Sequence, residues 1–381
     1  MRFLHLADLH LGKRLGEYDL LADQSHLLGQ VKALCRKCQV DALLLAGDIY
    51  DKTIPPVSAI ELLDEFLTSL ISDGIAIFLI SGNHDSGERL HFGSRLFQEK
   101  GLYITSEFKG SLSKVTLEDD FGPVQIWSMP FLRLGTIRHY FPETANCSYD
   151  QAVGTVLAHA PVKTQERNII LAHQFVTSSG RSPALAGSES PDIAVGTIDG
   201  VEASHFQDFD YVALGHIHRS QSVGRETVRY PGSPMKYSLS EVLGEKSVLL
   251  VTLEEKGVVT VEKHPLVPLR DLRHVTGPIA KLLDPANVAN PMDFMWVTLT
   301  DEAPILDAIG QVKGVYPHTL KLDYDNQMTR ISARTSPFGQ VRQKPLEDLF
   351  SDFYQSVTGT PPTQEEWMLF RDCLENEENS Q

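Results

Sequence analysis

The segment Ile75-Ala-Ile-Phe-Leu-Ile-Ser-Gly-Asn-His-Asp85 joins an apolar run directly to a cluster of polar residues. A short continuous apolar run that ends at a turn signal is typical of a strand buried inside a sheet, so we expect a strand over Ile75–Ser81. The residues that follow combine a flexible glycine with an amide, an imidazole and a carboxylate. The segment therefore predicts a buried strand that presents chemically useful side chains at its carboxyl end.

The same arrangement recurs along the chain. Apolar runs predict strands over Arg2–Ala7, Asp41–Ala46, Asn168–Ala172 and Tyr211–Leu214, and each is followed by Asp, His or both. Where two such residues are separated by one position, a strand would point both side chains the same way. Because ligands of open α/β sheets gather beyond the carboxyl ends of strands, we expect one pocket. Its candidate residues are Asp8, His10, Asp48, Asn83, His84, Asp85, His173, His216 and His218.

Helical spacing of apolar residues separates the first three of these strands. It predicts helices over Asp23–Gln39 and Val57–Ser72, the second after Pro55-Pro56. A β-α-β-α-β order of this kind indicates an α/β domain with both faces of the sheet covered. Further strands are expected over Leu112–Thr116 and Val124–Ser128, a mobile loop over Val176–Val195, and β-hairpins over Arg229–Val267.

The residue types at the strand ends indicate a reaction. Carboxylate and amide oxygens mixed with imidazole nitrogens, without paired cysteines, suit divalent transition metals. Two such metals can clamp a phosphate and activate water, so the pattern predicts phosphoester hydrolysis. Each motif alone is also compatible with an ordinary turn or a hydrogen-bonded histidine. The histidines outside the strand ends are expected to be structural or solvated: His5, His26, His91, His159, His205 and His264.

Composition narrows the class of protein. The chain has 381 residues, of which 42% are hydrophobic and 22% charged, as in globular proteins of more than one domain. No apolar run is long enough to cross a bilayer, and the N-terminus runs into Asp8 without a leader sequence, so we expect an intracellular, cytoplasmic protein without a membrane partner. Cys35 and Cys38 lie in a predicted helix with no second pair, and we interpret them as ordinary helix residues rather than zinc or redox ligands.

The net charge of −16 argues against a broad basic surface that would hold nucleic acid unaided. Part of the excess is local, because residues 365–381 are rich in Glu and Asp. Metal ligands add to it, and bound cations would offset their charge. The charge is therefore compatible with a nuclease, but its affinity for DNA would need help from a partner.

The order D-x-H, GD, GNHD, H and GHxH resembles that of the calcineurin-like metallophosphoesterase family over about residues 1–270. More narrowly, His5–Lys13, Gly47–Asp51, Ser81–Asp85 and Tyr230–Pro234 resemble the SbcD family of bacterial nucleases. The resemblance implies an α/β metallophosphoesterase β-sandwich flanked by helices, with a small α+β capping domain and C-terminal helices. The implied boundaries are 1–268 for the nuclease domain, 269–335 for the capping domain and 345–375 for the partner-binding helices. For the capping domain we expect strands over Met295–Leu299 and Leu320–Tyr324 and a helix over Ala303–Val312.

The resemblance also implies roles for individual residues. Asp8, His10 and His218 would hold one metal, Asn83, His173 and His216 would hold the other, and Asp48 would bridge both. The metals would be two divalent ions, most readily Mn²⁺, although the same ligands could take iron or zinc. His84 would contact the scissile phosphate and protonate the leaving oxygen, and Asp51 would orient His84, with Asp85 as the competing candidate.

The implied activity is that of a metal-dependent DNA nuclease: a double-strand exonuclease and a single-strand or hairpin endonuclease. It would act with an SbcC-like ATPase in DNA end processing, repair and recombination. The rival hypotheses are a stand-alone phosphodiesterase for small nucleotides and a non-catalytic scaffold with structural metals. DNA phosphates could meet a group of basic residues near the motifs, which could equally be solvated charges: Lys13, Arg14, Lys52, Arg89 and Arg95.

The C-terminal region carries an apolar stripe at helical spacing within predicted helices over Pro345–Val357 and Thr363–Leu374. Thr363-Gln-Glu-Glu366 predicts a capping box at the start of the second helix. The stripe could pack on its own domain, but so short a unit can hardly build a core, which favours docking onto the ATPase. The resemblance further implies a homodimer within a heterotetramer, for which Val57–Ser72 offers an amphipathic surface. The stripe and its extension are Leu346, Leu349, Phe350, Phe353, Tyr354, Val357, Trp367, Met368 and Phe370.

Overall fold

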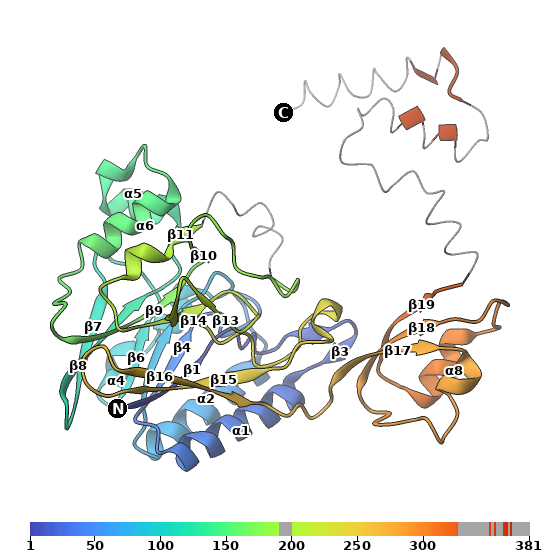
Figure 1. Cartoon of the computed structure of the whole chain (residues 1–381), viewed down its shortest axis with the longest axis horizontal. Coiled ribbons are helices and arrows are strands. Elements are labelled where there is room, and N and C mark those ends of the chain that lie inside the picture. The colour runs from blue at the N-terminus through green and yellow to red at the C-terminus, as the bar shows by residue number, and fades with distance from the viewer. Residues whose placement is uncertain (190–199, 327–349, 352–353, 356–360, 365, 368–381) are drawn as a thin grey trace.

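The computed structural model describes residues 1–189, 200–326, 350–351, 354–355, 361–364 and 366–367. Two six-stranded sheets form the main body, and a smaller three-stranded sheet stands beside it (Figure 1). The expected architecture, a metallophosphoesterase sandwich flanked by helices, is confirmed.

The first sheet has a parallel centre, as the alternating strands and helices predict. Its strands lie in the order β16-β15-β1-β4-β5-β6, and β1, β4, β5 and β6 run parallel. Helices make the crossovers from β1 to β4 and from β4 to β5, so the carboxyl ends of these strands share one edge. The bounds are β1 Arg2–Leu6, α1 Leu21–Cys38, β4 Ala42–Ala46, α2 Val57–Ser72, β5 Ala76–Ile80, α3 Gly87–His91, α4 Ser94–Gln98, β6 Leu102–Thr105, β15 Ser247–Leu253 and β16 Val259–Pro265.

The second sheet repeats this plan. Its order is β13-β14-β12-β9-β8-β7, and β8, β9, β12 and β14 run parallel. The expected hairpins over Arg229–Val267 are partly confirmed: β15 and β16 form one, whereas β14 pairs with β13 before it. The bounds are β7 Ser113–Asp119, β8 Gly122–Met129, α5 Leu134–Tyr140, η1 Pro142–Thr144, α6 Tyr149–Ala158, β9 Arg167–His173, η3 Ala203–Phe206, β12 Tyr211–Gly215, β13 Gln221–Val223, β14 Arg225–Tyr230 and η4 Leu239–Glu241.

Apolar side chains from both sheets fill the space between them, with Phe3 and Phe78 facing Ile169 in one fully buried cluster. A histidine also bridges the sheets there: His5 Nδ1 lies 2.9 Å from the Tyr211 hydroxyl, and its Nε2 lies 3.1 Å from the Leu214 carbonyl oxygen. Burial lowers the pKa of His5 to about 3, so the ring is neutral at pH 7. The expectation of a structural role for this residue agrees with these contacts.

Helices cover the outer faces of the sandwich. Leu27 and Val31 of α1, with Leu63 and Phe66 of α2, pack on the first sheet. Helices α5 and α6 pack on the second sheet, where Val153 and Val156 are buried (Figure 1). Each sheet therefore buries both of its faces, which explains why the central strands are continuous apolar runs.

The smaller sheet forms a βαβαβ module from β17 Leu272–Gly277, α7 Ile279–Leu282, β18 Phe294–Leu299, α8 Ala308–Val315 and β19 Thr319–Tyr324. Both strand pairs are parallel. The expected helix over Ala303–Val312 is misplaced, because the Asp307 side chain accepts a hydrogen bond from the Gly310 amide at 3.2 Å and caps α8 there. Strand β17 was not predicted, since Leu272 and Val275 are its only large apolar residues.

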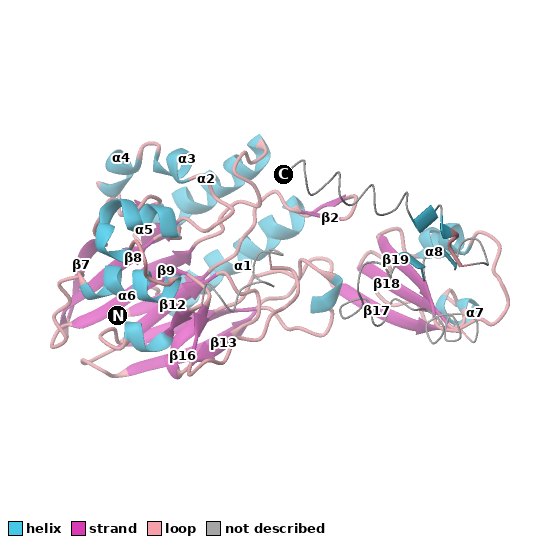
Figure 2. Ribbon diagram, turned by 90° about the horizontal axis from the view of Figure 1, so that it is seen from above, coloured by secondary structure: helices cyan, strands magenta, loops and turns pink. Residues whose placement is uncertain are grey.

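The module contacts the main body through a small hairpin and the start of α1 (Figure 2). The hairpin consists of β2 Arg14–Leu15 and β3 Tyr18–Asp19. The Tyr18 hydroxyl donates to the Pro317 carbonyl at 2.8 Å, and its ring lies 5.9 Å from that of Phe294. Arg270 forms an ion pair with the fully buried Asp23 carboxylate. Apolar packing and a buried ion pair thus hold the module against the body.

The other sequence expectations concern the loop over Val176–Val195 and the C-terminal helices, and the structure describes only part of each segment. In the loop expected over Val176–Val195, β10 Val176–Thr177 pairs with β11 Val201–Glu202, and residues 190–199 lie outside the described residues. At the C-terminus the capping box is present, because the Glu366 amide donates to Thr363 Oγ1 at 3.4 Å and the Thr363 amide donates to Glu366 Oε2 at 2.7 Å. Most of the two predicted C-terminal helices also lies outside the described residues. Within the described ranges, no helix has both the length and the apolar content to span a membrane.

Candidate metal centre

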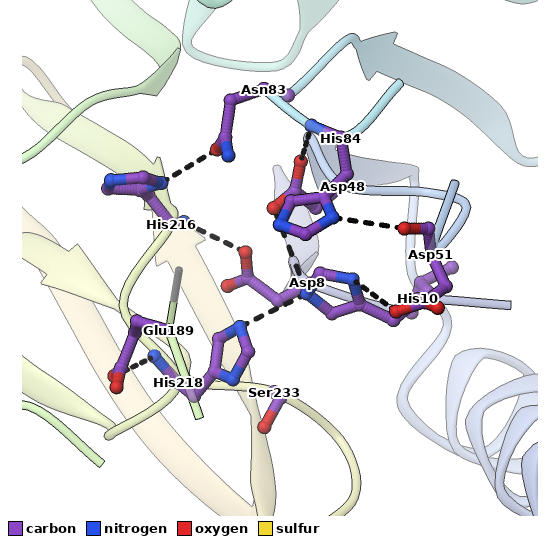
Figure 3. Close-up of polar contacts among 12 residues, drawn as sticks. Asp8, His10, Asp48, Asp51, Asn83, His84, Glu189, His216, His218 and Ser233 are labelled. Carbon is purple, nitrogen blue, oxygen red and sulfur yellow. Dashed lines mark hydrogen bonds and ion pairs between the residues drawn. The ribbon is translucent and has the colours of Figure 1, made fainter. Parts of the chain in front are cut away.

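The carboxyl ends of five central strands meet at one edge of the sandwich and carry the candidate residues (Figure 3). From the first sheet, Asp8 and His10 follow β1, Asp48 follows β4, and Asn83 and His84 follow β5. From the second sheet, His173 ends β9, and His216 and His218 follow β12. The structure brings together all seven expected metal ligands; Asn83 is partly exposed and the other six are buried.

The backbone at this edge differs from the extended geometry that the sequence predicted. Asp8, His10, Asp48 and His216 have positive φ angles of 56°, 43°, 50° and 103°. The two residues of Asp8-Leu-His10 therefore converge through turns beyond the strand rather than through strand alternation. Backbone bonds hold the turns, because the Asp8 amide donates to the Gly47 carbonyl and the His10 amide to the Asp48 carbonyl, both at 3.0 Å. Left-handed conformations in residues other than glycine are costly and cluster at functional sites.

Two glycines permit the close approach of these turns. A Cβ atom on Gly82 would lie 2.0 Å from Asp48 Oδ1, and one on Gly215 would lie 1.8 Å from the Ala46 carbonyl oxygen. Any larger residue would push the motif of one strand away from that of its neighbour. The glycines of the Gly82-Asn83-His84 and Gly215-His216 motifs are thus explained by packing at the site.

The first cluster consists of Asp8, His10 and His218. The Nε2 atoms of His10 and His218 face each other at 3.1 Å. Burial lowers the pKa of His10 to about 3 and that of His218 well below its usual value, so both rings are neutral. Asp8 Oδ1 accepts a hydrogen bond from the His216 amide at 2.9 Å, whereas its buried Oδ2 has no hydrogen-bond partner among the described residues.

The second cluster consists of Asp48, His173 and His216, with Asn83 beside it. Asn83 Oδ1 lies 3.1 Å from His173 Nε2 and 2.9 Å from His216 Nδ1. His173 Nδ1 donates to the Ala46 carbonyl at 2.7 Å, which turns Nε2 toward the cluster. Burial lowers the pKa of His216 to about 3. One amide oxygen and two imidazoles therefore converge on one point.

Asp48 lies between the clusters. Its Oδ2 is 3.4 Å from His173 Nε2 and 3.7 Å from His10 Nε2. Burial opposes its charge, but His173, His10 and His84 outweigh burial and hold the pKa of Asp48 well below its usual value. Burial likewise opposes charge on His173, yet the carboxylates of Asp48 and Asp8 raise its pKa to about 9.

The donor set fits divalent metal ions. Burial raises the pKa of Asp8 to about 8, which shows how strongly the site disfavours uncompensated negative charge. A cation would restore the ionised carboxylate and give the unpartnered Oδ2 a ligand to bind. The neutral imidazoles of His10 and His218 face each other through their Nε2 atoms. Two such nitrogens suit a shared metal ion better than direct contact with each other. The residues of the two clusters could thus hold one ion each.

His84 stands at the rim of the site, beside Asp48 and His10. Its amide donates to Asp48 Oδ1 at 3.0 Å, and its ring lies edge-on to His10 at 4.8 Å. Its Nδ1 meets the backbone carbonyl oxygen of Asp51 at 3.0 Å, so Nδ1 carries the proton of this bond (Figure 3). The family resemblance implied that Asp51 orients His84. The contact with the His84 ring is made by the backbone carbonyl of Asp51 and not by its carboxylate. The carboxylate itself lies 2.6 Å from Lys13 Nζ and 3.7 Å from His10 Nδ1.

Asp85, the competing candidate for orienting His84, ties two motif loops together. Its buried carboxylate accepts hydrogen bonds from the amides of Ile49 at 3.1 Å, Tyr50 at 2.9 Å and Gly82 at 2.9 Å. Burial raises the pKa of Asp85 to about 6. Its contacts indicate that it fixes the loop of Asp48 against the loop of Asn83.

The five basic residues considered for DNA contact occupy different places. Lys13 lies in the site, where it forms an ion pair with Asp51 and sits 5.6 Å above the Tyr237 ring. Arg14 belongs to the small hairpin, and Lys52 is exposed next to Asp51. Arg89 on α3 and Arg95 on α4 are exposed. The contacts with Asp51 and Tyr237 therefore place Lys13 in the site.

Several supporting residues were missed by sequence reasoning. Gln24 of α1 donates to the His10 carbonyl at 2.8 Å, and the buried Tyr237 hydroxyl donates to the Leu9 carbonyl. The Tyr237 ring packs edge-on against His10 at 5.5 Å and His218 at 6.0 Å. Ser188, Glu189 and Lys246 also contact His218. Tyr237 lies just beyond the Tyr230–Pro234 motif. That motif was the only sequence signal near any of these supporting residues.

Comparisons with known proteins identify two families along the chain. A family described as calcineurin-like phosphoesterase matches residues 1–220, and one described as type 5 capsule protein repressor C-terminal domain matches residues 268–358. The SbcD component of the SbcCD nuclease of Staphylococcus epidermidis is 32% identical over 364 residues, which cover 94% of each chain. Its counterpart in Staphylococcus saprophyticus is 30% identical over 363 residues, again 94% of each chain.

Among solved structures, a dimetal phosphatase from Danio rerio aligns with a TM-score of 0.40 and 12% identity, covering 70% of this chain and 96% of that one. The family model over residues 1–220 and the two relatives that are at least 30% identical show which family the chain belongs to. The chain belongs to the calcineurin-like phosphoesterase family and, within it, to the SbcD nucleases, hydrolases of phosphodiester bonds that use divalent metal ions.

Proposed function

We propose that this chain is a DNA nuclease that acts as a double-strand exonuclease and as a single-strand or hairpin endonuclease. In the cell it would process DNA ends for repair and recombination. The observation that carries the proposal is the pair of donor clusters with Asp48 between them, its Oδ2 3.4 Å from His173 Nε2 and 3.7 Å from His10 Nε2, and with the partly exposed His84 beside it. Such a site places a phosphodiester between two charge-stabilising positions and a proton donor.

We assign the residues as the geometry supports. Asp8, His10 and His218 would hold one ion, and Asn83, His173 and His216 would hold the other, with Asp48 between the two positions. We propose Mn²⁺ as the metal, which when bound there would activate water and stabilise the charge that develops on the phosphate. Oxygen and imidazole donors without thiolate are compatible with this choice.

The chain itself orients the groups that handle the substrate. His84 Nδ1 donates to the Asp51 carbonyl, and we propose that its Nε2 faces a bound phosphodiester. From there His84 can protonate the leaving oxygen. Lys13 pairs with the Asp51 carboxylate, which lies 3.7 Å from His10 Nδ1. Asp51 would therefore act through its backbone and its neighbours rather than as a base.

The proposal is tested with the full chain, stripped of metal and then resupplied with Mn²⁺, Zn²⁺ or Fe²⁺. Hairpin, blunt duplex and single-stranded DNA are offered with and without an SbcC-like ATPase. We expect Mn²⁺ to restore DNA cleavage and the ATPase with ATP to increase it. Hydrolysis of a small cyclic or dinucleotide substrate that far exceeds cleavage of every DNA would reject the nuclease proposal in favour of a small-molecule phosphodiesterase.

We propose that the division of labour follows the expected boundaries: 1–268 for catalysis, 269–335 for capping and 345–375 for binding the ATPase. The match of residues 268–358 to a C-terminal family supports this division. Among the described tail residues, the Phe350 ring meets Tyr354 at 5.8 Å and Trp367 at 5.2 Å, so part of the stripe pairs within the tail. In the assay above, a chain that ends at Lys344 should keep hydrolysis of a small diester and lose both ATPase binding and ATP stimulation. ATPase binding as tight as that of the full chain would remove the tail from this role.

We also propose that the chain forms a homodimer through the groove between α2 and helices α3 and α4. The groove is largely apolar, and Phe92 and Phe97, which line it, are 85% and 41% exposed. An exposed apolar patch of this kind, next to an amphipathic helix, is typical of an interface. Light scattering at micromolar concentration should give a dimer for the wild type and a monomer for Phe92→Glu. Leu243→Glu, at a residue 97% exposed elsewhere, is the matched control and should remain dimeric. A monomeric wild type would contradict the proposal.

A further inference from the structure

His218 is held differently from the other histidines of the centre. His173 belongs to β9, and its Nδ1 donates to the main-chain carbonyl of Ala46, which ends β4 in the other sheet. His218 instead lies beyond the end of β12, and the partner of its Nδ1 is a side chain from another loop, Ser188 Oγ, at 2.6 Å. The orientation of this ring therefore depends on a residue far away in the chain that is not itself an expected ligand.

The loop that carries Ser188 is a closed turn fastened to His218. Gly187 has a φ of +87°, a left-handed conformation that favours glycine. The Glu189 carboxylate accepts hydrogen bonds from the amides of Ala186 at 2.8 Å and Gly187 at 2.6 Å, which closes the turn. The same carboxylate accepts the His218 amide at 3.1 Å (Figure 3). Ser188 is thus presented to the imidazole by a turn built for that position.

The Ser188 contact decides which nitrogen of His218 carries a proton. His218 Nε2 faces His10 Nε2 at 3.1 Å, inside the first cluster. A ligand nitrogen must offer a lone pair, so Nδ1 has to carry the hydrogen of the neutral ring. In that tautomer Nδ1 donates to Ser188 Oγ. Partners of this kind fix both the tautomer and the orientation of metal-binding histidines.

The main chain of His218 is secured independently of Ser188. Lys246 Nζ donates to the His218 carbonyl at 3.0 Å and to Ser233 Oγ at 2.8 Å, and it pairs with the buried Glu241 carboxylate. Loss of the Ser188 hydroxyl would therefore release the imidazole ring while the peptide stays in place. Ser188 itself is only half-buried, so its replacement should not disturb folding.

We propose that Ser188 is a positioning residue that fixes the tautomer and ring orientation of His218 and thereby sets the affinity of the metal position formed with Asp8 and His10. The hydroxyl acts only through His218 and touches neither the second cluster nor the substrate. The inference rests on the metal centre of the proposed function but not on its substrate.

The test is a calorimetric Mn²⁺ titration of the metal-free full chain and of Ser188→Ala. We expect one of the two metals to bind about 10–100-fold more weakly in the variant, as for loss of other partners of metal ligands, and the second to bind as in the wild type. Ser188→Thr keeps the hydroxyl and should restore most of the affinity. Ser182→Ala, at an exposed serine of the same loop, is the matched control and should bind both metals normally.

A second comparison shows whether Ser188 acts through His218. In a His218→Ala background, Ser188→Ala should cause no further loss of metal affinity. Unchanged affinity for both metals in Ser188→Ala, equal weakening of both, or an additive loss on top of His218→Ala would overturn the inference. Failure of the wild type to cut DNA would reject the nuclease proposal and leave these metal affinities as a separate result.

Discussion

Replacement of Asp48 by alanine should remove both metal ions from the protein and abolish cleavage of DNA. The carboxylate is 3.4 Å from His173 Nε2 in one cluster and 3.7 Å from His10 Nε2 in the other, so its loss deprives both positions of a charged ligand. It also leaves Asp8 as the single carboxylate for two cations. We expect the loss of activity to exceed the roughly 10–100-fold typical of residues that only support a ligand. Metal counting by native mass spectrometry measures the effect.

His218→Ala is the matched control for Asp48→Ala. It removes a ligand of one cluster only, because His218 Nε2 faces His10 and lies outside the group of Asp48, His173 and His216. This variant should retain one metal. If Asp48→Ala also retains one metal, with the same affinity as His218→Ala, then Asp48 does not bridge the two positions.

His84→Ala should keep both metals and lose about 10²–10⁴-fold in the rate of DNA cleavage, the usual contribution of general acid catalysis. The contact between His84 and Asp48 Oδ1 runs through the backbone amide, which alanine retains. The ring, held by the Asp51 carbonyl at 3.0 Å, is the part that alanine removes. Single-turnover cleavage at saturating Mn²⁺, with metal content measured on the same sample, tests both halves of this expectation.

Two substrates with different leaving groups distinguish a role of His84 as a proton donor from a role as a metal ligand. A nitrophenyl diester has a leaving group that departs without protonation, so His84→Ala should impair its hydrolysis much less than that of DNA. His84 also lies within a third group of possible donors, with His10 and Asp48. Loss of a metal in His84→Ala, or equal loss of activity on both substrates, would show that His84 is a ligand or a structural residue instead.

The strand ends were predictable from sequence because their signal is local. An apolar run that ends in Gly47-Asp48 or Gly82-Asn83-His84 identifies a buried strand and its exit loop without knowledge of the rest of the chain. The parallel order of strands in both sheets then brings these exits together. Periodicity and the placement of polar residues were thus sufficient for an α/β domain and for the list of candidate residues, whereas the sandwich and the metal-ligand roles came from the family resemblance.

The contacts that orient the ligands could not be predicted, because they join segments that carry no shared pattern. Ser188 reaches His218 across 30 residues, and Tyr237 reaches the Leu9 carbonyl across 228. Asp51 shows another limit: a sequence suggests what a carboxylate does but not that a backbone carbonyl makes the relevant bond. Left-handed turns at Asp8 and His10 likewise follow from the packing of two loops, which strand alternation does not describe.

Two metal ions that share Asp48 at this edge of the sandwich would be visible in anomalous X-ray diffraction from crystals of the full chain grown with Mn²⁺. We expect two manganese peaks, one beside Asp8, His10 and His218 and the other beside Asn83, His173 and His216, with the Asp48 carboxylate in contact with both. A single peak, or a peak bound to His84 with none at His218, would contradict the account.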